Sequence, residues 1–217
     1  MKIFRSLIIV VFVLRINIES FSQTLGIKAG LNLSNIHFDY ESGGQVYNDK
    51  FKIKPGFNIG AIVEIPLNKT FSLENNLLLL TKGYRNSYKT QYIDTEGTVN
   101  YLCLDFILNS KVSVMFGNLK IYGTLGPYIG FGILGKMKGE AIENNQATAW
   151  SNKISWGSNP DDDLRRLDFG LDMGGGVEIS HIQIGISYCF GLANLSVIGG
   201  NNNIGNRVLE ISLGYKF

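Results

Sequence analysis

Long apolar runs are missing from this 217-residue chain, whose mean hydropathy is only +0.08. After Leu14 no uninterrupted apolar stretch is long enough to cross a bilayer as a helix, which excludes a helical membrane bundle. Charge is scarce too, since charged residues make up 18% of the chain, and the formal net charge of +2 comes entirely from residues 1–22. Residues 23–217 therefore lack the excess positive charge that would indicate a nucleic-acid partner.

What the chain has instead is alternation, most clearly in its last stretch, residues 206–217. One face is apolar and ends in two aromatic residues: Leu209, Ile211, Leu213, Tyr215 and Phe217. The other face is small or charged: Val208, Glu210, Ser212, Gly214 and Lys216. This pattern is typical of a strand with lipid on one side and a polar interior on the other, although a soluble sheet gives the same pattern with core and solvent exchanged.

The same pattern recurs along the chain and predicts eight strands. They cover residues 24–36, 56–65, 71–85, 98–116, 121–133, 167–179, 182–190 and 206–217. In the third strand the alternation that places Leu77 on the outer face also places the polar Asn75 there, facing lipid. A β-bulge would shift the alternation and return Asn75 to the inner face.

The connections between these strands are sorted by length. Turns of a few residues follow the second, fourth and sixth strands, whereas long polar segments follow the first, third, fifth and seventh. Outer-membrane barrels are built with short periplasmic turns and long outer loops, and closure removes the sheet edges that lipid cannot satisfy. We therefore predict an all-β fold, an eight-stranded antiparallel up-and-down transmembrane β-barrel with both termini in the periplasm, over a soluble sandwich or lipocalin-like barrel.

The N-terminus has the features of a secretory signal peptide. Lys2 and Arg5 precede the apolar run of residues 7–14, and small residues follow at Ser20 and Ser22. We predict a signal peptide over residues 1–22 and an outer-membrane barrel domain over residues 23–217; the alternative is a buried N-terminal element.

Charged residues recur on the inward face of the predicted strands. Those assigned to the lumen are Lys28, Glu64, Glu74, Asp105, Lys111, Asp172, Glu178, Glu210 and Lys216. An eight-stranded barrel is just wide enough for side chains to fill it, so opposite charges are expected to pair there and plug the interior. Glu74 with Lys111 and Lys28 with Glu64 are the expected pairs near the short turns. The functional alternative is a selectivity ring for a solute.

Other candidate sites are weak, and no catalytic residue, metal ligand or cofactor is predicted. His37 and His181 are the only histidines. His37 with Asp39 lies at an expected outer strand end, where some outer-membrane enzymes keep catalytic residues, but a loop histidine is favoured. The acidic run of residues 161–163 lacks the spacing of a calcium loop, which favours a solvated loop over a site for a divalent ion or a basic partner.

The two cysteines, Cys103 and Cys189, point inward on strands three apart around the predicted barrel. A disulfide needs Cα atoms within about 7 Å of each other, so free buried thiols are favoured.

Several short motifs follow one another along the predicted strands: Leu73-Glu74, Lys82-Gly83-Tyr84, Tyr101-Leu102, Gly126-Pro127-Tyr128-Ile129-Gly130, Asp168-Phe169-Gly170-Leu171, Gly174-Gly175-Gly176-Val177-Glu178 and Gly191-Leu192. In their order and spacing they resemble the PorT-like outer-membrane β-barrel family of Gram-negative bacteria. The fourth strand departs from the family, having Cys103 and Asp105 where Glu and Pro are usual. The resemblance implies an outer-membrane location, and some members are linked to a protein-secretion apparatus.

Three function classes follow from this interpretation. The favoured one is a non-enzymatic structural or interaction barrel with a plugged lumen, whose loops or turns bind a protein partner such as a secretion apparatus. The alternatives are a narrow porin-like channel and a membrane-embedded hydrolase or acyltransferase. Lipid, lipopolysaccharide and the barrel-insertion machinery are the other expected partners, and Phe217 is predicted to be the assembly signal that this machinery reads.

Overall fold

The structure, a computed structural model, describes residues 23–217 except 43–44, 90–92, 144–145, 160 and 198–202. The predicted signal peptide lies outside the described residues. No helix in the described part of the chain is long and apolar enough to cross a membrane.

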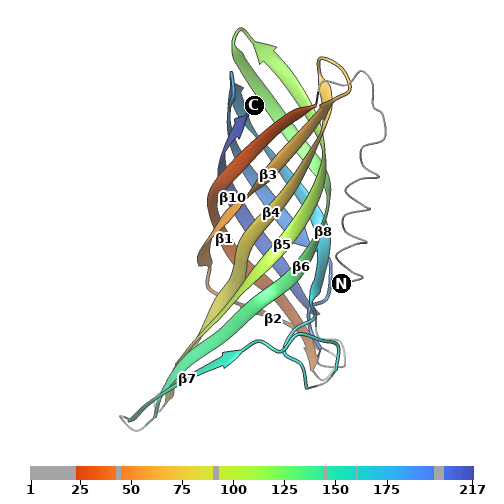
Figure 1. The fold of residues 1–217 in the computed structure, drawn as a ribbon. Coiled ribbons are helices and arrows are strands. Elements are labelled where there is room, and N and C mark those ends of the chain that lie inside the picture. The colour runs from red at the N-terminus through yellow and green to blue at the C-terminus, as the bar shows by residue number, and fades with distance from the viewer. Residues whose placement is uncertain (1–22, 43–44, 90–92, 144–145, 160, 198–202) are drawn as a thin grey trace, which may run out of the picture.

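All regular structure in the described residues is antiparallel β-sheet (Figure 1). The strands are β1 (Thr24–Ser42), β2 (Gln45–Lys50), β3 (Lys54–Pro66), β4 (Phe71–Lys89), β5 (Ile93–Phe116), β6 (Leu119–Glu143), β7 (Gln146–Lys153), β8 (Leu167–Ile179), β9 (Ile182–Gly191) and β10 (Asn203–Lys216). Eight of them, all but β2 and β7, pair in chain order, and β10 pairs with β1 to close the ring. The predicted eight-stranded up-and-down barrel is confirmed.

Short turns join β3 to β4, β5 to β6 and β8 to β9, all at the upper end in Figure 1. Gly117 and Ser180 adopt left-handed conformations in two of them, with φ of 62° and 53°. In the turn before β4 the Asn68 side chain accepts hydrogen bonds from the backbone N–H groups of Thr70 and Phe71, at 2.9 and 2.8 Å. This end, which we call the turn end, also holds the first residues of β1 and the last of β10.

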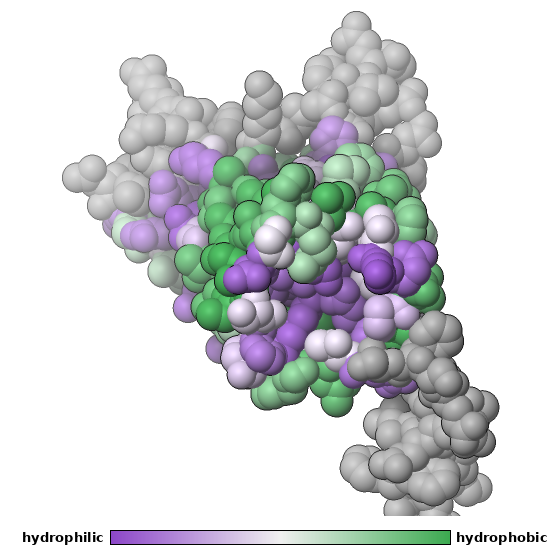
Figure 2. All heavy atoms as spheres, turned by 90° about the horizontal axis from the view of Figure 1, so that it is seen from above, coloured by the Kyte–Doolittle hydropathy of each residue, from purple (hydrophilic) through white to green (hydrophobic). Residues whose placement is uncertain are grey.

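The wall of the barrel is apolar outside and polar inside. Outward residues such as Leu31, Leu213 and Phe116 expose 69%, 60% and 63% of their surface, whereas the inward residues Lys82, Asp105 and Lys111 expose none. Figure 2, which looks down on the turn end, shows hydrophobic residues around a hydrophilic centre. Apolar surface on this scale is not left to water by monomeric soluble proteins, so this wall is a lipid-facing one.

Three segments that the sequence predicted as loops are in large part strands, and that prediction is wrong. β1 continues to Ser42 and pairs with β2, while β4, β5 and β6 extend well beyond the apolar wall and β7 adds to β6. Residues of β4, β5, β6 and β7 thus form a sheet that protrudes from the end opposite the turns, at the lower left of Figure 1. The alternation disappears there because both faces are polar, but the backbone hydrogen bonds continue.

The predicted bulge near Asn75 is also wrong. The register of β4 with β3 and with β5 runs without a shift past this residue. The irregularity lies between β5 and β6, where Leu102 pairs with Leu134 but Cys103 pairs with Gly132. Ile133 is therefore the extra residue, and it marks the point at which β6 leaves the barrel wall.

Candidate functional site

Every barrel strand contributes a polar side chain to the lumen near the turn end. These are Lys28 of β1, Glu64 of β3, Glu74 of β4, Lys111 of β5, Lys120 of β6, Glu178 of β8, Gln183 of β9 and Lys216 of β10. We call the three glutamates with Lys111, Lys120 and Lys216 the turn-end cluster. Residues distant in sequence meet here because each strand passes the turn end once with its inward face toward the axis.

Lys111 lies at the centre of the turn-end cluster. Its Nζ is 2.8 Å from Glu74 Oε2 and 3.1 Å from Glu64 Oε2, and it also contacts Glu178 Oε1. The Tyr122 ring faces the same ammonium, with 4.3 Å between Nζ and the ring centroid. A fully buried ammonium is tolerated in such a place only because carboxylates surround it.

Lys216 and Lys120 complete this cluster. Lys216 Nζ lies 2.5 Å from Glu178 Oε1 and 3.6 Å from Glu74 Oε2, and it contacts Glu64 as well. Lys120, with 27% of its side chain exposed, approaches Glu178 at 3.0 Å from the turn side. Each of the three carboxylates therefore faces at least two lysines.

Of the two ion pairs expected from the sequence, Glu74 with Lys111 is formed. The pair of Lys28 with Glu64 is not, because among the described residues the ion pairs of Glu64 are made by Lys111, Lys120 and Lys216. Lys28 is half-buried and lies opposite Gly60 in the β1–β3 ladder, four residues from the level of Glu64. Tilt of the strands thus brings β5 and β10, rather than β1, to Glu64.

A second group of charges, the central layer, lies deeper in the lumen. Lys82 Nζ is 2.7 Å from Asp105 Oδ2 and 2.9 Å from Asp168 Oδ2. Tyr128 and Asn206 also donate hydrogen bonds to Asp168, at 3.2 and 2.7 Å. All five of these side chains are buried.

Asp172 and Glu210 complete the central layer. Asn109 Nδ2 donates to Asp172 Oδ1 at 2.6 Å, and the thiol of Cys189 lies 3.2 Å from Asp172 Oδ2 and 3.7 Å from Glu210 Oε1. Glu210 Oε2 is buried without a hydrogen-bond partner. The central layer therefore holds four carboxylates, of which Asp105 and Asp168 pair with Lys82. This acidic excess is absent from the turn-end cluster.

Between the two layers lies a small polar cavity of about 20 Å³. Its lining includes Lys28, Glu74, Asn109, Asp172 and Gln183. This volume suits about one water molecule.

Sequence reasoning did not single out Lys82, Asp168, Lys120, Tyr128 or Asn206 as site residues. The strand register, once known, identifies Lys82 and Asp168. Asp105 pairs with Gly130, and Gly130 pairs with Asp168, so two carboxylates flank a residue without a side chain. Such an arrangement requires a nearby cation, and Lys82 is the inward lysine on the neighbouring strand.

The structure also describes the surroundings of the weaker candidate residues. His37 is exposed on β1, and nothing is described of the Asp39 side chain. Asp162 accepts hydrogen bonds from the Ser155 hydroxyl and the Asn159 backbone, both at 2.9 Å, which makes the acidic run part of a turn. Cys103 and Cys189 are buried free thiols.

Three carboxylates of the turn-end cluster have the spacing of a metal site, since oxygens of Glu64, Glu74 and Glu178 lie within 4.8 Å of one another. Lys111 and Lys216 already contact all three. The arrangement is thus that of a cation site filled by two ammonium groups of the chain itself.

The protruding sheet presents a second kind of surface. Every residue of β7 is exposed, and among the described strands β7 pairs only with β6. A shallow groove of about 530 Å³ lies on this sheet, and its lining includes Glu96, Lys138 and Trp150, which is 43% exposed. An unpaired strand edge beside an exposed tryptophan is a surface that can accept another polypeptide.

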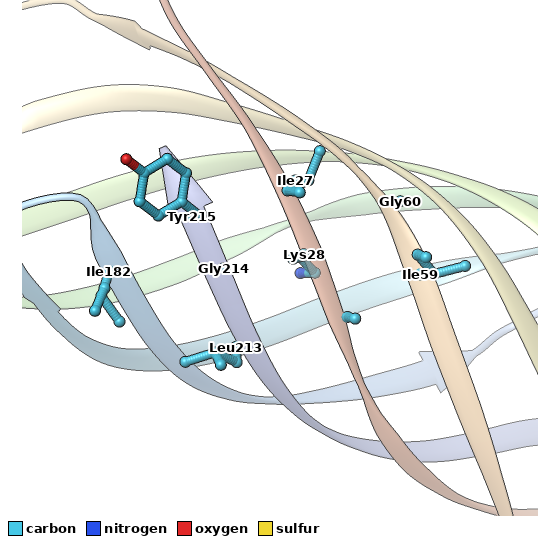
Figure 3. A pocket seen from close by; sticks show the side chains of 9 residues that line it. Ile27, Lys28, Ile59, Gly60, Ile182, Leu213, Gly214 and Tyr215 are labelled. Atoms are coloured by element: carbon cyan, nitrogen blue, oxygen red, sulfur yellow. The ribbon is translucent and has the colours of Figure 1, made fainter. Parts of the chain in front are cut away.

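The lipid-facing wall carries its own depression where β10 meets β1 (Figure 3). It has a volume of about 420 Å³, and its lining combines large side chains such as Ile27, Ile59 and Tyr215 with Gly60 and Gly214. The lining is almost wholly apolar, which suits lipid chains.

A closed antiparallel barrel with a lipid-facing wall and a lumen of buried ion pairs defines the class, an outer-membrane β-barrel. Residues 21–197 match the family described as outer membrane protein beta-barrel domain, and the chain belongs to this family. Location in the outer membrane follows from this membership.

Solved structures of small barrels are similar to the chain. Ail, the attachment invasion locus protein of Yersinia pestis, is 15% identical, with 89% of this chain and 98% of that one covered and a TM-score of 0.34. Neisserial surface protein A (NspA) is 14% identical, with 91% and 98% covered and a TM-score of 0.41. Among curated proteins no match is found.

Proposed function

We propose that the protein is a non-enzymatic outer-membrane interaction protein. In this proposal the lumen is plugged by its own side chains, and the protruding sheet at the long-loop end binds a partner protein. The observation that carries the proposal is the turn-end cluster, in which three carboxylates and three ammonium groups converge from six strands.

The charge pairing supports a plug rather than a selectivity ring. A selectivity ring presents charge of one sign to a passing solute. Here Lys111 and Glu74 are almost fully buried and bonded to each other, so neither is presented to a solute. The cavity next to them has room for about one water molecule.

The exposed edge of β7 supports the second part of the proposal. Protected edge strands carry proline, several charges or a bulge, whereas residues 146–153 contain a single charged residue, Lys153, and no proline. An extended segment of a partner can add to this edge through backbone hydrogen bonds, and Trp150 can anchor it.

The further parts of the proposal rest on the family pattern. Short turns in the periplasm are usual for such barrels, which would place the protruding sheet outside the cell. Residues 1–22 are proposed as a signal peptide, and Phe217 as the assembly signal. The resemblance to the PorT-like family extends the partner proposal to a protein-secretion apparatus.

Planar-bilayer recordings of the folded full-length barrel test the plug. We expect no steady conductance from the wild-type protein and discrete openings from a variant with both Lys111→Ala and Glu74→Ala. The matched control is Leu213→Ala, which alters only the outer wall. Steady, ion-selective conductance of the wild-type barrel would contradict the plug and favour the narrow channel.

Site-specific photocrosslinking in native outer membranes tests the partner surface. A crosslinker at Ala149 or Ser151 of β7 is expected to trap one defined protein, and the same group at Leu213 is expected to trap none. Equal products at both positions would contradict binding at β7.

A further inference from the structure

A second groove on the outer wall lies at the long-loop end, and its lining is more polar than that of the depression in Figure 3. Its volume is about 640 Å³. The lining residues come from β1, β9, β10 and the segment between β2 and β3, and they include Leu33, Tyr188, Arg207 and Leu209. Among these described lining residues there is no carboxylate, so the groove combines apolar surface with the positive charge of Arg207.

The guanidinium of Arg207 is held in a fixed orientation. Its Nη1 donates hydrogen bonds of 2.8 Å to the backbone carbonyls of Gly191 and Asn206. Its central carbon lies 3.6 Å from the centroid of the Phe190 ring, a stacked cation–π contact. Arg207 is only partly buried. Within the described part of the chain its Nε and Nη2 donate no hydrogen bond. The N–H groups on these two nitrogens are therefore available to bind a ligand.

Such a fork matches the geometry of a phosphate, to which arginine donates two parallel hydrogen bonds. The apolar lining of the groove indicates the chemistry of the group attached to the phosphate. Leu33 and Tyr188 are exposed on the outer wall, and Leu209, which is partly buried, pairs with both of them. A ligand here therefore has an anionic end and an apolar body.

We propose that this groove binds a phosphorylated glycolipid of the outer leaflet, with the phosphate on Arg207 and an acyl chain along Leu33, Tyr188 and Leu209. The choice of leaflet rests on the proposed orientation, in which the long-loop end faces outward. The proposal is independent of the partner surface on β7, since the groove lies on the barrel wall.

The chain offers a matched control in Arg166. It too lies over an outward phenylalanine, with 5.4 Å between its central carbon and the centroid of Phe131. Unlike Arg207, its guanidinium is exposed and makes no hydrogen bond to a carbonyl among the described residues, and Arg166 does not line the groove. The two arginines therefore separate a preorganised site from general attraction between cations and anionic lipid.

The test measures binding of diphosphoryl lipid A to the folded full-length barrel in uncharged detergent, by native mass spectrometry and by titration. We expect Arg207→Gln to weaken binding about tenfold, equivalent to about 1.4 kcal/mol, and Arg166→Gln to leave it within about twofold. Arg207→Lys keeps the charge without the fork and is expected to fall between wild type and Arg207→Gln.

Three further ligands identify the source of the phosphate. Dephosphorylated lipid A is expected to bind wild type and Arg207→Gln equally, because the group that Arg207 recognises is missing. Phosphatidylglycerol and inorganic phosphate are expected to bind more weakly than diphosphoryl lipid A.

Equal loss in the Arg166→Gln and Arg207→Gln variants would overturn the proposal, as would a loss in Arg207→Gln that does not depend on the ligand phosphate. Arg207-dependent preference for phosphatidylglycerol would overturn the choice of glycolipid, and the β7 crosslinks would still test the partner surface. If Arg207→Gln does not fold, shown by loss of heat-modifiable migration, Arg207→Lys and the phosphorylated and dephosphorylated ligands on wild type decide the question.

Discussion

The two charged layers of the lumen are built differently. In the turn-end cluster each carboxylate faces at least two lysines, so that Glu178, for example, contacts Lys111, Lys120 and Lys216. In the central layer the described ion pairs of Asp105 and Asp168 are both made by Lys82. One layer is redundant, and the other depends on a single ammonium group.

This difference bears on stability because a buried charge without a partner is far more costly than a missing pair. Losing one lysine of the turn-end cluster leaves other lysines within reach of the same carboxylates. Losing Lys82 leaves two fully or almost fully buried aspartates without an ion-pair partner among the described residues. The central layer is therefore the more sensitive one.

The largest expected effect is that of Lys82→Met. It is expected to lower the free energy of unfolding by about 3–5 kcal/mol, the range for breaking a buried pair from one side. Denaturant titration of the folded barrel in detergent measures it. Lys120→Met, whose side chain is 27% exposed, is the control and is expected to change stability by about 1 kcal/mol or less.

Adding Asp105→Asn and Asp168→Asn to Lys82→Met is expected to recover part of the loss, because the amides remove the unpaired charge. Equal destabilisation by Lys82→Met and Lys120→Met would contradict the contrast between the two layers.

The next effect concerns the redundant layer. Glu74→Ala and Lys111→Ala are each expected to lower the free energy of unfolding by less than about 3 kcal/mol, since other members of the cluster remain. Because the two groups lie 2.8 Å apart, the double variant is expected to lose less than the sum, with a coupling energy of about 0.5–3 kcal/mol. Glu74→Ala combined with Lys82→Met is the control, and there the losses are expected to add. Additive losses for Glu74 and Lys111 would mean that their contact contributes nothing.

Period-two alternation could predict the barrel because the wall has two chemically distinct faces. Leu31 and Leu213 had to face lipid, and that alone set the inward face on which Lys111 and Glu74 lie. Neither the partners within the lumen nor the extent of the strands beyond the bilayer could be predicted in the same way. Strand tilt, which brings Lys216 rather than Lys28 to Glu64, leaves no trace in one strand's pattern, and β7 has both faces in water.

A smaller effect on the folded barrel is expected at Phe217, which is 71% exposed beyond β10. Phe217→Lys is expected to reduce the yield of assembled protein severalfold, because the insertion machinery is proposed to read this residue. Its effect on unfolding is expected to be only about 0–1 kcal/mol, the range for a lysine near the membrane interface. Phe116→Lys is the control, another lipid-facing aromatic at the turn end with 63% exposure. Equal yields of heat-modifiable protein from the two variants would remove the signal role of Phe217.

The smallest effect on the stability of the barrel is expected from a substitution in the protruding sheet, which is exposed where the lumen is buried. Trp150 is 43% exposed, and its ring covers Gly139 of the neighbouring strand rather than any buried residue of the wall. Trp150→Ala is therefore expected to change the free energy of unfolding by no more than about 0.5 kcal/mol, as for an exposed position. The same change is expected to abolish the β7 crosslink to the partner, because an exposed aromatic anchor can supply 2 kcal/mol or more, roughly thirtyfold, of binding free energy.

Lys82→Met, provided that enough folded protein is obtained, is expected to show the reverse, reduced stability with the crosslink retained. A variant pair that lost both properties together would mean that the sheet and the lumen form one cooperative unit, and partner binding could then not be assigned to the sheet alone.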